Sequence, residues 1–135
     1  MININEYLLD KGKTKKYNVD RPKKGCDVQD IIDWLDSFGV DNWYSEHSLM
    51  TTPEEGHIGY HIGSDAWQNK CASLDIPLSK YESQSIVVYP KTDRTYISGR
   101  YGSKDRNISF EQAIDFMEEI MENPFEAKLI DVSKL

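Results

Sequence analysis

Apolar residues recur at helical spacing in residues 27–38. They fall on one face of a helical wheel, which is the pattern of a helix that packs on a core: Val28, Ile31, Ile32, Leu35 and Phe38. Asp27 is a favourable N-cap, and Asp30 lies in the first turn, where the helix dipole favours an anion. Gly39 is a natural C-terminal stop. The pattern therefore predicts an amphipathic helix over this segment.

A second apolar stripe runs through residues 109–122. Its members again share one helical face: Phe110, Ala113, Ile114, Met117, Ile120 and Met121. Ser109 and Gln112 have the spacing of a capping box, in which each side chain binds the backbone N–H of the other residue. Asn123 and Pro124 end the periodic pattern. We expect a helix over residues 109–122.

β-branched and aromatic runs predict the strands of the fold. The clearest signal is a hairpin over residues 85–101, where SIVVYP and TYISGRY flank the turn KTDR. Further strands are predicted over residues 43–50, 57–62 and 127–132. Two further helices are predicted over residues 4–10 and 64–74, the second capped by Ser64 and stopped before Pro77.

Hairpin-connected strands among separated helices are typical of the α+β class. We expect a mostly antiparallel sheet of about 4–5 strands packed by about 3–4 helices in a single pair of layers. A chain of 135 residues has the usual size of one domain, so residues 1–135 are predicted to form a single domain. Residues 11–25 are polar and basic, and are expected to form a flexible basic segment.

Charge is distributed unevenly along the chain. Between Cys26 and Asn69 there is no Lys or Arg but nine acids, so this block carries −9 against −7 for the whole chain. Such segregation bears on partners and solubility rather than on the fold. The many aromatic residues exclude a disordered acidic segment.

The acids of both amphipathic helices fall opposite the apolar stripes, with no basic residue among them. These positions are Asp30, Asp33 and Asp36 on the first helix, and Glu111, Asp115, Glu118 and Glu122 on the second. Like charges at i, i+4 destabilise a helix by about 0.2–0.5 kcal/mol per pair. Two interpretations are open: solvated faces neutralised by basic parts of the same chain, or a docking surface for a basic partner. Glu54 and Glu55 in the acidic block are assigned to the same surface.

The hairpin and the loop after it collect basic and aromatic residues. The candidates for contact with a phosphate-bearing ligand are Arg94, Tyr96, Arg100, Lys104 and Arg106. Arginine forks suit phosphates, and tyrosine rings suit stacking on bases. The alternative is a polar outer face that pairs with the acidic helices. A net charge of −7 argues against binding of duplex nucleic acid over a large surface.

The histidines and cysteines do not form a metal motif. His57 and His61 are separated by four residues, which in a strand places them about 13 Å apart at roughly 3.3 Å per residue. That distance is too long for a shared metal, so we expect neither a metal nor a cofactor. An acid–base histidine that works with a basic side chain stays open as an alternative. Cys26 and Cys71 are expected to be free, buried thiols.

The chain start lacks a cationic region followed by an apolar run, and no stretch approaches 18 apolar residues. We therefore expect a cytoplasmic protein that does not enter a membrane. In size and charge the chain resembles small acidic inhibitors of bacteria and phages, such as immunity proteins, antitoxin-like inhibitors and anti-defence proteins. The resemblance is one of size and composition.

The acidic faces predict a non-enzymatic binding or inhibitor protein. It would occupy a basic, nucleic-acid-handling site on a partner protein, with carboxylates imitating the charge of a nucleic acid. The alternative is a nucleotide- or phosphate-binding protein, or a small phosphodiesterase-type enzyme, that uses the Arg-rich hairpin and a histidine. A third option is a structural component of a larger particle. No catalytic motif is found, and no catalytic residue is assigned.

Overall fold

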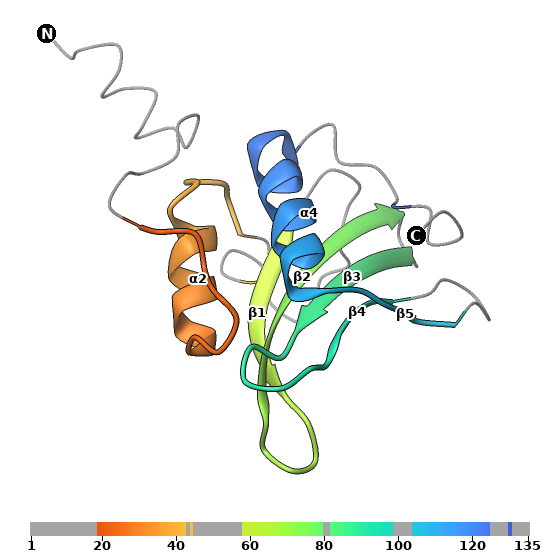
Figure 1. The fold of residues 1–135 in the computed structure, drawn as a ribbon. Helices are drawn as coiled ribbons and strands as arrows, with labels where there is room; N and C mark the ends of the chain where they lie inside the picture. Colours follow the sequence, from red (N-terminus) through yellow and green to blue (C-terminus); the bar gives the residue numbers. More distant parts are fainter. Residues whose placement is uncertain are drawn as a thin grey trace, which may run out of the picture.

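A computed structural model describes residues 19–42, 44, 58–79, 82–98, 104–124 and 130 of the chain. Its elements follow in the order α2 (Val28–Asp36), β1 (Gly59–Ser64), β2 (Lys70–Ser79), β3 (Glu82–Val88), β4 (Thr95–Ile97), β5 (Arg106–Asn107) and α4 (Phe110–Glu122). The five strands form one sheet in sequence order, and each strand runs antiparallel to the next (Figure 1). The α+β class and the antiparallel sheet are confirmed.

The strand register gives the sheet one continuous apolar face. Tyr60 lies opposite Leu74, Leu74 opposite Ile86, and Ile86 opposite Ile97. Directly paired residues point to the same side of a sheet, and all four side chains are buried. This row defines the core face of the sheet.

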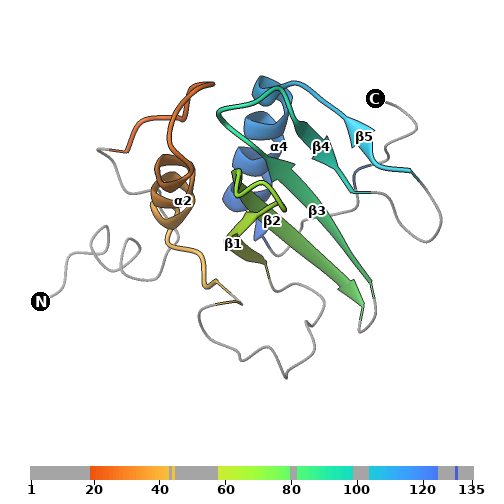
Figure 2. The ribbon, with the colours of Figure 1, turned by 90° about the horizontal axis from the view of Figure 1, so that it is seen from below.

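Both described helices pack on the core face. Ile31, Trp34 and Leu35 of α2 are fully buried in the same cluster as this row. From α4, the buried members of the cluster are Phe110, Ala113, Ile114, Met117, Ile120 and Met121. Helix α2 contacts β1 and β2, whereas α4 contacts β3 and β4, so the helices lie side by side on one side of the sheet (Figures 1 and 2).

Both helices begin as the sequence predicts. The backbone N–H of Asp27 donates to the Asp30 carboxylate at 3.1 Å. The Ser109 and Gln112 side chains each accept from the other residue's backbone N–H at 3.0 Å. These capping boxes satisfy N–H groups that the first helical turn leaves without partners. Among the described residues, no helix is long and apolar enough to cross a membrane.

The predicted helix over residues 64–74 is wrong, because these residues contain a turn and the start of β2. The Asp65 carboxylate accepts the backbone N–H groups of Trp67 and Asn69, both at 2.9 Å, and Gln68 adopts a φ of 64°. The reversal lets β2 pair with β1 on one side and β3 on the other. Trp67 is 81% exposed, so its side chain is not part of the core.

The described residues contain two helices rather than the expected three to four. One expected helix is replaced by β2, and the helix expected over residues 4–10 lies outside the described residues. The predicted strands 43–50 and 127–132 also lie almost wholly outside them. The predicted hairpin is confirmed in β3 and β4, although β3 begins three residues earlier, at Glu82. Most of residues 11–25 are not described.

Candidate functional site

Helices α2 and α4 together carry eight carboxylates and no basic side chain. We call this set the acidic layer: Asp30, Asp33, Asp36, Glu111, Asp115, Glu118, Glu119 and Glu122. The two helices run in the same general direction, so their C-terminal ends point the same way (Figure 1). Neither helix has a basic residue in its last turn. Because a helix C-terminus carries partial negative charge, the acids nearest the C-terminal ends, Asp36, Glu119 and Glu122, add to the negative potential there.

Basic side chains of the same chain neutralise part of the acidic layer and one carboxylate next to it. Arg21 forms ion pairs with Asp115 and with Glu118, the second at 3.1 Å. Lys91, on the β3–β4 turn, lies 2.9 Å from the Asp27 carboxylate at the N-cap of α2. Neutralisation by the chain's own basic residues therefore covers part of the surface, because one arginine serves two of the five carboxylates on α4.

The carboxylates of α2 have neutral partners. Asp33 accepts a hydrogen bond from Gln29 at 2.9 Å, and Asp36 accepts one from the Tyr60 hydroxyl. Within the described part of the chain, Asp30, Asp33 and Asp36 form no ion pair with a basic residue, and all three are exposed. Glu54 and Glu55 lie outside the described residues. Among the described residues, the members of the layer without an ion pair are thus the three aspartates of α2 and Glu111, Glu119 and Glu122 of α4.

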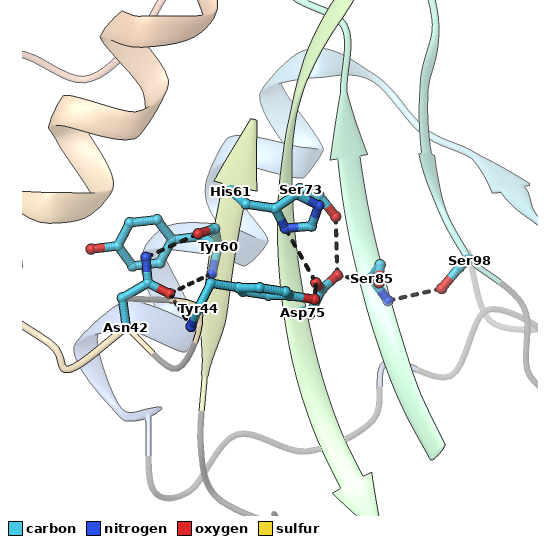
Figure 3. Close-up of polar contacts among 8 residues, drawn as sticks. All are labelled: Asn42, Tyr44, Tyr60, His61, Ser73, Asp75, Ser85 and Ser98. Carbon is cyan, nitrogen blue, oxygen red and sulfur yellow. Dashed lines mark hydrogen bonds and ion pairs between the residues drawn. The ribbon is translucent and has the colours of Figure 1, made fainter. Parts of the chain in front are cut away.

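The sheet face away from the helices holds a polar cluster that the sequence interpretation missed (Figure 3). Asp75 of β2 lies between Leu74 and Ile76 of the core face, so its side chain points to the opposite face. It is only 7% exposed. Its carboxylate accepts hydrogen bonds from Ser73 at 3.0 Å and from the hydroxyls of Ser85 and Tyr44. These hydroxyls offset the large desolvation penalty of a buried carboxylate.

His61 is held against this cluster. It lies opposite Ser73 in the register of β1 and β2, and its Nδ1 is 3.6 Å from an Asp75 oxygen. The Tyr44 ring packs on the imidazole with 4.5 Å between ring centroids. Nδ1 is buried, whereas the side chain as a whole is 40% exposed, so the outer edge of the ring faces solvent. A carboxylate behind Nδ1 favours the tautomer that carries its proton there and leaves Nε2 as an acceptor.

The structure brings together two of the predicted phosphate-ligand residues. The Arg94 guanidinium lies over the Tyr96 ring, 5.3 Å from its centroid, and also 5.0 Å from the centroid of Tyr89. Lys104 and Arg106 are exposed near β5, where Arg106 pairs with Ile97, a residue of the core face. Arg100 lies outside the described residues. Among the described members of the predicted group, Arg94 and Tyr96 are in contact, and Tyr89, which the prediction did not include, contacts Arg94 as well.

The two cysteines are free, as expected, with Cys71 buried and Cys26 half-buried. Burial and the charge of Asp30 raise the pKa of the Cys26 thiol, which keeps it protonated and weakly reactive. Within the described ranges, no three His, Cys, Asp or Glu side chains are arranged to hold a metal ion. His57 lies outside those ranges, so its predicted separation from His61 is not described.

The buried Tyr60 and the half-buried Tyr44 predict a loss of stability in alkali. Burial raises the pKa of Tyr44 and Tyr60 well above the ordinary value of about 10, and the carboxylates of Asp75 and Asp36 raise it further. A folded-state pKa above the unfolded value stabilises the fold fully below pH ~10, and this contribution is lost as the pH rises through the folded value. We expect the urea midpoint to fall above pH ~10. Replacing both tyrosines with phenylalanine should flatten that fall, and an unchanged slope would contradict the assignment.

Comparison with known proteins finds no match, whether against family models, curated proteins or solved structures. The class of the protein therefore rests on its own architecture. It is an α+β protein, and its described residues form a five-stranded antiparallel meander with two helices on one face.

Proposed function

We propose that this protein is a non-enzymatic binding protein whose acidic layer occupies a basic, nucleic-acid-handling site on a partner protein. The observation that carries the proposal is the position of the two base-free helices, which lie side by side on the same face of the sheet. Their charges act on the same region of solvent. A surface of this kind accelerates association with a positively charged partner.

The spacing of the acids supports a nucleic-acid-like charge pattern. Asp30, Asp33 and Asp36 follow one another at intervals of three residues, which is a rise of roughly 4.5 Å along the helix. One nucleic-acid strand carries a phosphate about every 3.4 Å. The helix therefore has a similar, somewhat lower, linear charge density, and a groove that binds phosphates would offer matching arginines and lysines.

The acids also oppose the stability of the helices that carry them. Glu119 and Glu122 lie in the last turn of α4, where the dipole favours cations. Replacing either with lysine is expected to raise the free energy of unfolding by about 0.3–1 kcal/mol. The same replacement should slow association with a basic partner. Such opposite effects on stability and binding are typical of residues kept for function rather than for the fold.

The test measures association with purified nucleases and nucleic-acid-binding proteins that have basic clefts, by biolayer interferometry at low and high salt. We expect the association rate constant for a cognate partner to fall steeply with salt. The double variant Glu119→Lys and Glu122→Lys should slow association about tenfold or more. Asp93→Lys makes the same charge change per site on the β3–β4 turn, outside the acidic layer, and serves as the matched control. Equal effects at both places, or rates independent of salt, would refute the proposal.

A further inference from the structure

His61 and Arg94 lie on the sheet face that the acidic layer does not use. In the strand register, His61 is opposite Ser73, Ser73 opposite Val87, and Val87 opposite Tyr96. This row crosses four strands on the face away from the helices, because the neighbouring row forms the core. Cys71, Val87 and Tyr89 form a small buried cluster there, with Tyr96 packed against it. His61 stays partly exposed and Arg94 exposed at the two sides of this cluster.

The guanidinium of Arg94 is oriented by its aromatic neighbours. Its Cζ atom lies over the rings of both Tyr89 and Tyr96, a cation–π arrangement that restricts the side chain. The guanidinium has five N–H donors that can bind an anion. The backbone N–H of Tyr89 donates to the Arg94 carbonyl at 3.0 Å, which fixes the turn. Asp65 interacts electrostatically with Arg94, but its carboxylate already accepts three N–H groups from Trp67 and Asn69.

The imidazole of His61 is oriented from behind. Asp75 lies at Nδ1 and Tyr44 lies against the ring. Asp75 is itself fixed by three hydroxyl groups from separate parts of the chain. This arrangement presents Nε2 outward as an acceptor for a hydroxyl or amino group. Asp75 is therefore a positioning residue, which would act on a ligand only through His61.

We propose that this face binds a small phosphate-bearing ligand of the nucleotide class, with the phosphate on Arg94 and a hydroxyl or amino group on His61. Three strand spacings of about 4.8 Å separate β1 from β4, so the two contacts are roughly 10–15 Å apart. Inorganic phosphate reaches only one of them, whereas a nucleotide is long enough to approach both. Arg94 suits the phosphate end of such a ligand, because an arginine fork binds phosphate oxygens in pairs. The site is independent of the acidic layer.

The test is a titration of the isotope-labelled full chain, followed by NMR at the His61 ring and the Arg94 side chain. The two probes are inorganic phosphate and adenosine monophosphate. We expect saturable binding of the nucleotide, about tenfold tighter than phosphate, with shifts at both residues. Arg94→Gln should weaken both probes about tenfold or more, and His61→Gln should reduce the nucleotide affinity toward that of phosphate. Lys104→Gln removes a basic residue of the predicted set outside the Arg94–Tyr96 contact, and should change neither.

The role of Asp75 has a spectroscopic readout that a purely structural role would not move. Nitrogen-15 spectra should show His61 with its proton on Nδ1 in the wild-type chain, and Asp75→Asn should shift the population toward the Nε2-protonated form while weakening nucleotide binding. Tyr44→Phe removes the hydroxyl that competes with His61 for the Asp75 carboxylate, but it keeps the ring that packs on the imidazole. His61 should therefore keep its proton on Nδ1 in this variant. The variant provides a second measurement if Asp75→Asn fails to fold. Three results would overturn the proposal. The nucleotide could show no saturable binding, or its affinity could be unchanged in Arg94→Gln. The two probes could also bind equally well without a shift at His61.

Discussion

Replacing Trp34 with alanine is expected to lower the free energy of unfolding by about 3–5 kcal/mol. Trp34 is fully buried, and its ring meets Phe38 edge to face with 5.3 Å between centroids. It is among the residues that join α2 to the sheet, so its loss leaves a cavity between the two layers. Domains of this size have only about 5–15 kcal/mol of stability. The loss is therefore a large fraction of the total stability.

Urea unfolding followed by far-ultraviolet circular dichroism measures this effect. Trp67→Ala is the matched control, because it removes the same side chain from an 81% exposed position on the β1–β2 turn. Exposed substitutions of this kind change stability by about 0.5 kcal/mol or less. Similar losses at Trp34 and Trp67 would contradict the packing described for α2.

The sequence was sufficient where the determinants of structure are local. Helix α4 was predicted because its apolar stripe repeats over more than three turns and its Ser109–Gln112 capping box lies within four residues. Helix α2 was predicted for the same reasons. Periodicity and caps act between neighbouring residues, so a single sequence contains the information they need.

The prediction from the sequence was wrong at β2, because residues far away along the chain decide the structure there. From Cys71 to Ile76 every residue of this interior strand is buried, whichever face of the sheet its side chain is on. A continuous buried run has no alternation that would distinguish it from a buried helix. Serine and aspartate at alternate positions, Ser73 and Asp75, were the available sign of a strand with one polar face. The cap at Ser64 and the stop before Pro77 outweighed it in the prediction.

The candidate sites show the same division between local and distant information. The acidic faces follow from a helical wheel, but the ion pairs of Arg21 join residues more than ninety positions apart and follow only from the fold. The polar cluster joins Tyr44 to Asp75 across 31 positions. It forms because β1, β2 and β3 share one register, which no pattern within a single segment reveals.

The sheet separates the two proposed surfaces. The acidic layer lies over the core face, and His61, Asp75 and Arg94 lie on the opposite face. Side chains on opposite faces of a strand do not contact each other. Charge reversal at Glu119 or Glu122 should therefore leave the His61 tautomer unchanged, and the two proposals can fail independently.

Replacing Asp75 with alanine is expected to lower the free energy of unfolding by about 2–4 kcal/mol. The change leaves the hydroxyls of Tyr44, Ser73 and Ser85 without their shared acceptor. A buried donor that loses its partner costs about 1–3 kcal/mol. The total should be smaller than three separate losses, because neighbouring hydroxyls can reorient toward one another and the desolvation penalty of the carboxylate is also removed.

Two matched variants separate the loss of this acceptor from other effects of the change. Asp75→Asn retains one acceptor oxygen at the same place, so it should lose less stability than Asp75→Ala. Asp36→Ala also deprives a tyrosine hydroxyl of its carboxylate, but Asp36 is exposed and water can replace it. Chemical denaturation of the three variants should rank Asp75→Ala as the most destabilised and Asp36→Ala as the least. If Asp75→Ala were as stable as the wild-type chain, the three hydroxyl bonds would contribute nothing to the fold, and the cluster would not hold His61 in place.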